Sequence, residues 1–187
     1  MTTTQSQSTA TLDEQQAEFS RNRFLAMPIA GAIAWTFIGI AGAFFPVPQA
    51  ALALFIGTGM IFYLGLLVAR FTGEDLFGRT RKNNVFDRLF LLTVVMALLV
   101  YAIAIPFFLI ERTSLPLTVG ILTGLMWVPF SGMIQHWVGL FHGIARTVLI
   151  VAVWYLFPER RFVIIPVVIV SIYLVTIYIL AGRRLSR

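Results

Sequence analysis

The segment that decides the fold spans residues 117–157 and reads LTVGILTGLMWVPFSGMIQHWVGLFHGIARTVLIVAVWYLF. It is apolar over a length that suffices for two helical membrane spans of about 20 residues each. Pro129, Ser131 and Gly132 lie between its halves and predict a break there. The segment also holds both histidines of the chain and a lone arginine, Arg146. We therefore expect two transmembrane helices, of which the second carries unusual polar groups.

The composition of the whole chain indicates an integral membrane protein. Hydrophobic residues make up 59% of the chain and charged residues 12%, and the mean hydropathy is +0.89. A soluble domain carries about 25% charged residues, so this chain lacks the charge to cover a soluble core. A membrane β-barrel would show alternating segments of about 10 residues, whereas these apolar runs are continuous. The predicted fold is an all-α, polytopic bundle of transmembrane helices.

Proline and charged residues interrupt the apolar runs, and the sequence divides into a polar tail and one domain. Residues 1–20 are polar and predict a disordered N-terminal tail, because they offer little to bury; a short helical turn near residues 12–19 is the alternative. Residues 21–187 form the predicted six-helix transmembrane domain. Its spans are expected at about 24–45, 49–69, 89–110, 117–134, 135–157 and 162–182. A basic loop, residues 70–88, joins the second span to the third.

The distribution of positive charge predicts the orientation. With the N-terminus inside, six spans leave ten Lys and Arg residues on the inner side and three on the outer side. This asymmetry favours a cytoplasmic N-terminus and C-terminus. If residues 117–157 crossed only once, the C-terminus would lie outside and the split would be nine to four. The net charge of +6 arises at the ends of apolar runs, which indicates membrane lipids as partners and argues against nucleic acid.

A polar stripe in the fifth span is the candidate site. At 100° per residue, Gln135, Gly139, His142 and Arg146 fall on one face of a helix. Other polar and small residues lie beside this face. The candidate ligand-binding residues are Gln135, His136, His142, Arg146 and Thr147.

Two interpretations of Arg146 stay open from the sequence. The eight acidic residues of the chain all fall outside its expected depth, and an arginine at a helix centre costs about 2.5–3.5 kcal/mol on insertion scales. In the structural interpretation, backbone carbonyls freed by Pro106 and Pro129 hold the guanidinium, helped by hydroxyls of Thr123 or Tyr101. In the functional interpretation, Arg146 lines a polar cavity that receives an anionic ligand, a lipid head group or a proton.

The sequence predicts neither a cofactor nor a metal ion. His136 and His142 point about 120° apart on a helix, so they cannot bind one ion together. The chain contains no cysteine and therefore no thiolate ligand. It also lacks GxSxG and HExxH motifs and a predicted intramembrane carboxylate. No catalytic residue is expected, and an enzymatic role is the least favoured.

One set of motifs points to a family. The pattern combines His136-Trp137-x4-His142 and Arg146-Thr147 with Trp154 and Phe157-Pro158-x2-Arg161-Phe162. It resembles the C-terminal half of a family of small bacterial multi-pass membrane proteins of unknown function, over roughly residues 115–180. The resemblance implies a bacterial cytoplasmic membrane protein and assigns no substrate.

Three functional hypotheses follow. The first is a transporter-like or ligand-binding membrane protein whose site is the polar stripe, with an anionic small molecule or a lipid head group as ligand. The second is an accessory or scaffold protein in which Arg146 is purely structural. The third is an intramembrane enzyme acting on lipid or phosphate groups, which requires a carboxylate such as Glu74 or Asp75 near the stripe. Assembly into a homo-oligomer is compatible with each.

Overall fold

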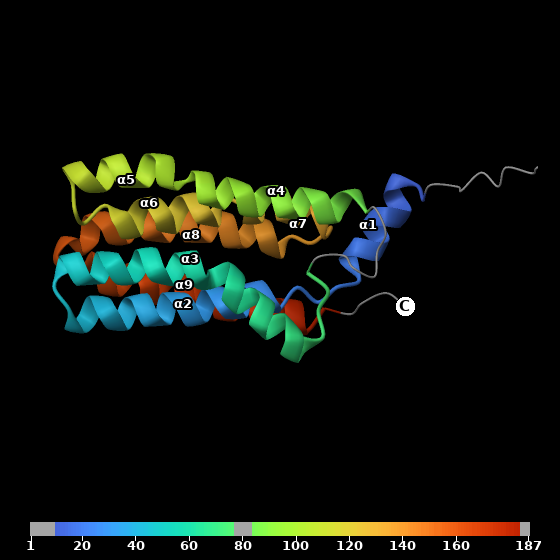
Figure 1. The fold of residues 1–187 in the computed structure, drawn as a ribbon, viewed down its shortest axis with the longest axis horizontal. Helices are drawn as coiled ribbons and strands as arrows, with labels where there is room; N and C mark the ends of the chain where they lie inside the picture. Colours follow the sequence, from blue (N-terminus) through green and yellow to red (C-terminus); the bar gives the residue numbers. More distant parts are fainter. Residues whose placement is uncertain (1–9, 77–83, 184–187) are drawn as a thin grey trace, which may run out of the picture.

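The computed structural model describes residues 10–76 and 84–183, which form helices and turns without a strand. Six helical segments in this part of the chain are long and apolar enough to cross a membrane, which confirms the predicted six-span, all-α fold. Successive spans run in opposite directions, so the end of the last span returns to the end of the bundle where the N-terminal helix α1 lies (Figure 1). The predictions for residues 1–9 and 77–83 fall outside the described ranges.

The observed spans follow the predicted ones with shifts of a few residues. They are α2 (Ala26–Phe44), α3 (Val47–Thr72), α4 with α5 (Val85–Leu99 and Tyr101–Ile110), α6 with α7 (Leu115–Gly124 and Trp127–Met133), α8 (Val138–Leu156) and α9 (Arg161–Ala181). The third span starts earlier than predicted because Asn84 caps it, accepting a hydrogen bond from the backbone of Phe86. The second span ends later, at Gly73, whose φ of 71° suits glycine.

The third and fourth spans are each broken into two helices. Val100 separates α4 from α5, and residues 125–126 separate α6 from α7. Pro129, Ser131 and Gly132 were expected to supply the break between spans four and five, but α7 continues through these residues. The chain turns at 134–137, where the expected bounds of the two spans meet. Pro129 lies in the first turn of α7, where its missing N–H removes no helical hydrogen bond.

The bundle is built around α2, α8 and α9. Helix α2 packs mainly against α3 and α9, while α8 packs against α9, α6 and α7. The α4–α5 span lies along one edge, at the top of Figure 1, where it contacts α6, α7 and α1. Side chains from α2, α6, α8 and α9 therefore meet inside the bundle, whereas much of α4 and α5 faces outward.

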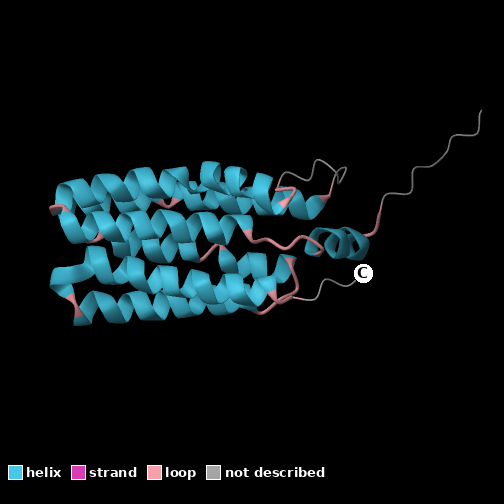
Figure 2. Cartoon of the chain, turned by 90° about the horizontal axis from the view of Figure 1, so that it is seen from below, coloured by secondary structure: helices cyan, strands magenta, loops and turns pink. Residues whose placement is uncertain are grey.

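The N-terminal segment corrects one expectation. Residues 12–20, assigned to a disordered tail, form helix α1 (Leu12–Ser20) beyond the ends of the long helices (Figure 2). Thr11 and Glu14 form a capping box, in which the backbone N–H of Thr11 donates to the Glu14 carboxylate at 2.8 Å. Phe19 is 1% exposed and packs on Phe24 and Phe90. One buried aromatic side chain and a good cap thus order a segment that its average polarity suggested was disordered.

Candidate functional site

Arg146 lies near the middle of α8 and is completely buried. Its Nη1 donates to the Tyr173 hydroxyl of α9 at 3.2 Å, and its Nη2 donates to Oγ1 of Thr123 on α6 at 3.1 Å. The guanidinium carbon is 5.4 Å from the ring centre of Trp35 on α2 and 5.5 Å from that of Tyr173. These distances allow cation–π attraction. One cation thus joins four helices.

The charge of Arg146 has no ion-pair partner in the described part of the chain. Its hydrogen-bond acceptors there are both neutral hydroxyls, and its Nε has no partner. A guanidinium cannot lose its proton under ordinary conditions, so the cost of burying it is only partly offset. Of the two carbonyls expected to help, the one that Pro129 would free is that of Leu125, and it accepts from the backbone of Val128. Of the hydroxyls considered, Thr123 binds Arg146 and Tyr101 bonds Thr58.

Glycines make the room that these polar side chains occupy. A Cβ added to Gly124 would lie 2.8 Å from Cδ of Arg146. A Cβ added to Gly31 would lie 2.6 Å from the hydroxyl oxygen of Tyr173. Both are shorter than ordinary carbon contacts, so any larger residue would displace the group that the glycine accommodates. Small residues on α6 and α2 therefore support the geometry around Arg146.

His142 lies one turn before Arg146 and is also fully buried. Its Nδ1 is 2.9 Å from the hydroxyl of Thr176, which donates its own proton to the Ile172 carbonyl at 2.8 Å. The proton of the His142–Thr176 bond must therefore come from Nδ1, which assigns the tautomer. The other nitrogen, Nε2, has no partner. The ring stacks on Trp127 with centres 4.2 Å apart.

The structure brings together two of the five predicted site residues. His142 and Arg146 share the inner face of α8, as predicted. Gln135 and His136 precede α8, in the turn after α7, and Gln135 has a φ of 50°. The Gln135 amide donates to Gln16 of α1, and Nδ1 of His136 accepts from a backbone N–H. Thr147 donates to a carbonyl of its own helix. These three lie apart from the Arg146 cluster.

The turn residue His136 has an environment of its own. Partial burial lowers the pKa of His136 below its ordinary value, and the positive charge of Arg183 lowers it further.

The α8 helix begins only at Val138, so the expected continuous stripe from Gln135 to Arg146 does not form. In residues 10–76 and 84–183, groups of three or more His, Cys, Asp or Glu side chains that could hold a metal ion are absent.

The sequence did not single out the α9 partners of the site. Tyr173 and Thr176 are three residues apart, which places them on one helical face, and they bond Arg146 and His142 respectively. Their spacing in an otherwise apolar span is a weak signal of a second polar stripe. Trp35 lies fully buried, and its ring centre is 5.4 Å from the guanidinium carbon.

A cavity of about 90 Å³ adjoins this cluster. Tyr173 and Thr123, the two hydrogen-bond partners of Arg146, both line it. Thr58 and Tyr101 line it too, and their hydroxyls are hydrogen-bonded to each other. The remaining lining is mostly apolar and comes from Met27, Gly59, Ile61, Phe62, Val94, Ala97, Leu98, Met126 and Trp127. The lining of the cavity thus combines mostly apolar residues with four residues that carry hydroxyls.

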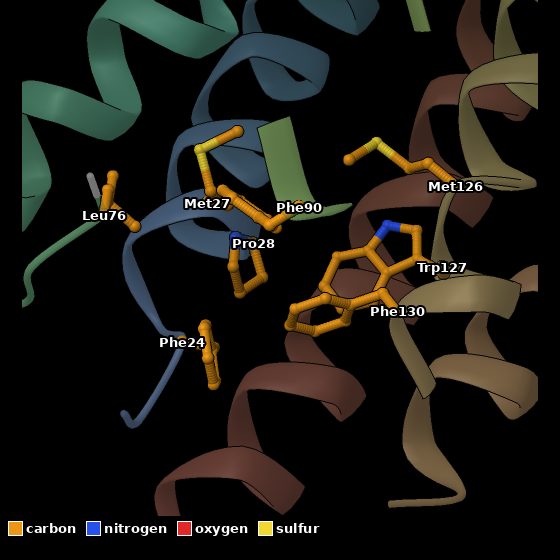
Figure 3. A pocket seen from close by; sticks show the side chains of 8 residues that line it. All are labelled: Phe24, Met27, Pro28, Leu76, Phe90, Met126, Trp127 and Phe130. Atoms are coloured by element: carbon orange, nitrogen blue, oxygen red, sulfur yellow. The ribbon is translucent and has the colours of Figure 1, made fainter. Parts of the chain in front are cut away.

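A second, smaller pocket of about 20 Å³ lies toward α1 and is entirely apolar. Figure 3 shows Met27 and Pro28 of α2 on one side of it and Trp127 and Phe130 of α7 on the other. Met27 and Trp127 line both hollows, so the two adjoin. Trp127 lines this pocket, and its indole stacks on the ring of His142.

Together the fold and the buried cluster define a multi-pass helical membrane protein with a polar intramembrane centre. Residues 12–183 match a family of unknown function, DUF7010, and the chain belongs to that family. The match extends well beyond residues 115–180, over which the motifs suggested a resemblance. A search of curated proteins and a search of solved structures found no match.

Proposed function

We propose that this protein is transporter-like and binds, within the membrane, a ligand with an anionic or hydrogen-bond-accepting group. The observation that carries the proposal is the position of Arg146. It is a buried cation without a carboxylate partner in the described residues, and both of its hydroxyl partners line one cavity. A charge acts strongly over short distances in a medium of low dielectric constant. A ligand oxygen in the cavity would supply the compensation that Arg146 lacks.

Hydrogen-bond accounting supports Tyr173 as the donor to that ligand. The hydroxyl of Thr123 gives its only proton to the carbonyl of Val119 at 2.6 Å. The Tyr173 oxygen accepts from Arg146, and its own proton has no acceptor among the described residues. A phenol that accepts from a cation is a stronger donor, because hydrogen bonds in a chain polarise one another.

Thr58 and Tyr101, which also line the cavity, offer no second free hydroxyl proton. Thr58 donates to the carbonyl of Leu54 at 2.6 Å, so Tyr101 must be the donor in the bond between Tyr101 and Thr58. Among the hydroxyls of the lining residues, that of Tyr173 is therefore the one whose proton has no acceptor among the described residues, and it accepts from the guanidinium of Arg146. This arrangement suits a carboxylate, phosphate or carbonyl oxygen.

The broken helices support a transporter-like role. The α4–α5 break at Val100 adjoins Tyr101, and the α6–α7 break adjoins Met126 and Trp127, all of which line the cavity. Transporters often place discontinuous helices at midplane binding sites, where interrupted helices can move. Two breaks beside one polar cavity thus favour binding coupled to conformational change.

A scaffold role is the second candidate, and one observation favours it. Arg146 is 0% exposed and contacts Trp35, Thr123 and Tyr173, so it ties together helices α2, α6, α8 and α9. An intramembrane enzyme has less support. Glu74, a carboxylate considered for it, instead caps α2 by accepting from the backbone of Leu25 at 2.8 Å and of Ala26 at 3.1 Å.

We further propose the orientation and location of the protein. The α1 end of the bundle carries Arg21, Arg23, Arg70, Arg88 and Arg183, and the opposite end carries Arg112, Arg160 and Arg161. This excess supports a cytoplasmic position for the α1 end and both termini. The family resemblance supports the cytoplasmic membrane of a bacterium. Membrane lipids, and further copies of the chain, are the partners that such a location offers.

Thermal stability with matched additives tests the ligand site. The purified protein in detergent is melted with decanoate, acetate, inorganic phosphate or decyltrimethylammonium, and the series is repeated with Tyr173→Phe. We expect an anion to raise the melting temperature of the parent, because binding to the folded state stabilises it. Tyr173→Phe should lose at least half of that gain, and the cation should give none. Equal gains in parent and variant would overturn the proposal.

A further inference from the structure

The polar cavity has two ends of different character. At the inner end, Tyr173 and Trp127 are each 6% exposed. At the outer end, Leu98 of α4 is 60% exposed, and Gly59 of α3 is exposed with open space where a Cβ would stand. Gly59 and Leu98 are the two exposed residues among those that line the cavity, and the side of the cavity that they form is here called the mouth. Both lie within membrane-spanning segments, so the mouth faces lipid.

The mouth is apolar and the inner end is polar. Ile61, Phe62, Val94 and Ala97 line the cavity beside the mouth, while the free hydroxyl of Tyr173 lies at the inner end. Apolar groups move readily from water onto an apolar surface such as the mouth, whereas a free, hydrated ion loses favourable hydration when it crosses one. The lining changes from apolar at the mouth to polar at the inner end. It therefore suits a molecule with a polar head and an apolar chain.

The volume of the cavity suffices for the head group of an amphiphile and not for its chain. About 90 Å³ is several times the roughly 10–15 Å³ that one water molecule requires. A head group of a few atoms fits such a space, and a long chain attached to it would have to leave through the mouth. The lipid phase outside the mouth would then hold the chain.

A second groove leads toward the mouth from the α1 end of the membrane. It measures about 230 Å³ and is lined mainly by apolar residues, with Asp87 and Arg88 in the first turn of α4. It shares Met27 and Phe62 with the polar cavity. The two hollows therefore adjoin, and the second one extends toward the α1 end of the bundle.

We infer that the cavity takes its ligand from the bilayer, and that the ligand is a single-chain amphiphile with a carboxylate or similar acceptor head. The head binds at the Tyr173 hydroxyl, in the field of Arg146, and the chain passes between Gly59 and Leu98. This inference rests on the proposed function, because it concerns the same site. It adds the chemical class of the ligand and the route by which it arrives.

Photolabelling in liposomes tests the route. The parent, Gly59→Trp and Leu52→Trp are reconstituted with a fatty acid that carries a diazirine in mid-chain, and labelled peptides are quantified by mass spectrometry. A tryptophan at position 59 has open space beside the helix and should block the mouth. Leu52 is 59% exposed on α3, about two turns away, and provides the matched control. We expect labelling near the mouth, reduced at least fivefold by Gly59→Trp alone.

The outcomes separate this inference from the proposed function. Unchanged labelling in Gly59→Trp, with decanoate stabilisation still dependent on Tyr173, would overturn the route and leave the site standing. An equal loss of labelling in Leu52→Trp would also overturn the route through the mouth. Labelling would then report only that the fatty acid partitions onto the outer surface of the bundle. Stabilisation by acetate or phosphate equal to that by decanoate would overturn the amphiphile class. If Gly59→Trp melts well below the parent, Leu98→Trp replaces it under the same criteria.

Discussion

The Arg146 guanidinium on α8 donates a hydrogen bond of 3.2 Å to the Tyr173 hydroxyl on α9, and Tyr173 also lines the intramembrane cavity. Tyr173 thus contacts a buried cation and forms part of the cavity wall. A neutral acceptor compensates a cation less than a carboxylate does. Both the stability of the bundle and the binding of a ligand should therefore respond to changes in this pair.

We predict that Tyr173→Phe destabilises the protein only when Arg146 is present. Removing the hydroxyl leaves a guanidinium N–H without its acceptor, at about 1–3 kcal/mol for an unsatisfied buried group. In the Arg146→Met background this penalty should vanish, which a double-mutant cycle of melting temperatures in detergent measures. Tyr178→Phe, at a residue 81% exposed, serves as control. A loss of the same size in both backgrounds would show that Tyr173 acts through packing alone.

We predict that Gly139→Ala lowers the melting temperature, whereas Gly59→Ala does not. A Cβ at Gly139 would lie 2.9 Å from the backbone nitrogen of Ser131, so α7 and α8 must separate. Overpacking of this kind costs about 1–3 kcal/mol. At Gly59 the space is open, and alanine favours the helix. Comparable melting temperatures for the two variants would contradict the close packing of α7 against α8 at Gly139.

The orientation is predicted from single cysteines, because the chain has none of its own. Thr72→Cys lies at the α1 end, and Glu159→Cys lies at the opposite end; both positions are exposed. An impermeant thiol reagent added to intact bacterial cells should label position 159 and not position 72. Both should react after lysis. Labelling at 72 in intact cells would reverse the orientation.

At the end of the bundle opposite α1, Glu111 should contribute stability that depends on pH. The backbone N–H and hydroxyl of Thr113 donate to its carboxylate and hold the pKa of Glu111 below its ordinary value of 4.5. A lowered folded-state pKa stabilises the fold above the unfolded value and loses this effect as pH falls through the folded value. Glu111→Gln should therefore melt below the parent at pH 7, and the difference should shrink as the pH falls below 4.5. A difference that does not shrink as the pH falls would contradict this assignment.

Much of the fold follows from hydropathy and proline, because a membrane span must be long, apolar and internally hydrogen-bonded. Helix ends were less predictable. The start of α8 carries no side-chain cap, so periodicity alone extended the helix back to Gln135, which instead turns with a positive φ. In α1, a capping box at Thr11 and burial of Phe19 outweigh the average polarity of the segment.

The site was predictable where its residues share one helix. His142 and Arg146 are four residues apart, and helical geometry places them together. Tyr173 and Thr176 reach them from another helix, and a sequence does not reveal which face of α9 meets α8. The same limit hid the role of Gly31, which makes room for the Tyr173 ring from a third helix. Contacts between distant segments depend on packing that only the structure provides.

The most direct test of whether Arg146 serves a ligand is the melting temperature of Arg146→Met with and without decanoate. The parent is measured beside it in the same detergent. Methionine keeps much of the unbranched stem that packs at Gly124 and removes the charge. If Arg146 is held for a ligand, the variant without decanoate should melt at or above the parent, because a costly buried cation is gone. It should also lose the response to decanoate. A drop of several degrees, with an undiminished response, would contradict the claim and assign Arg146 a purely structural role.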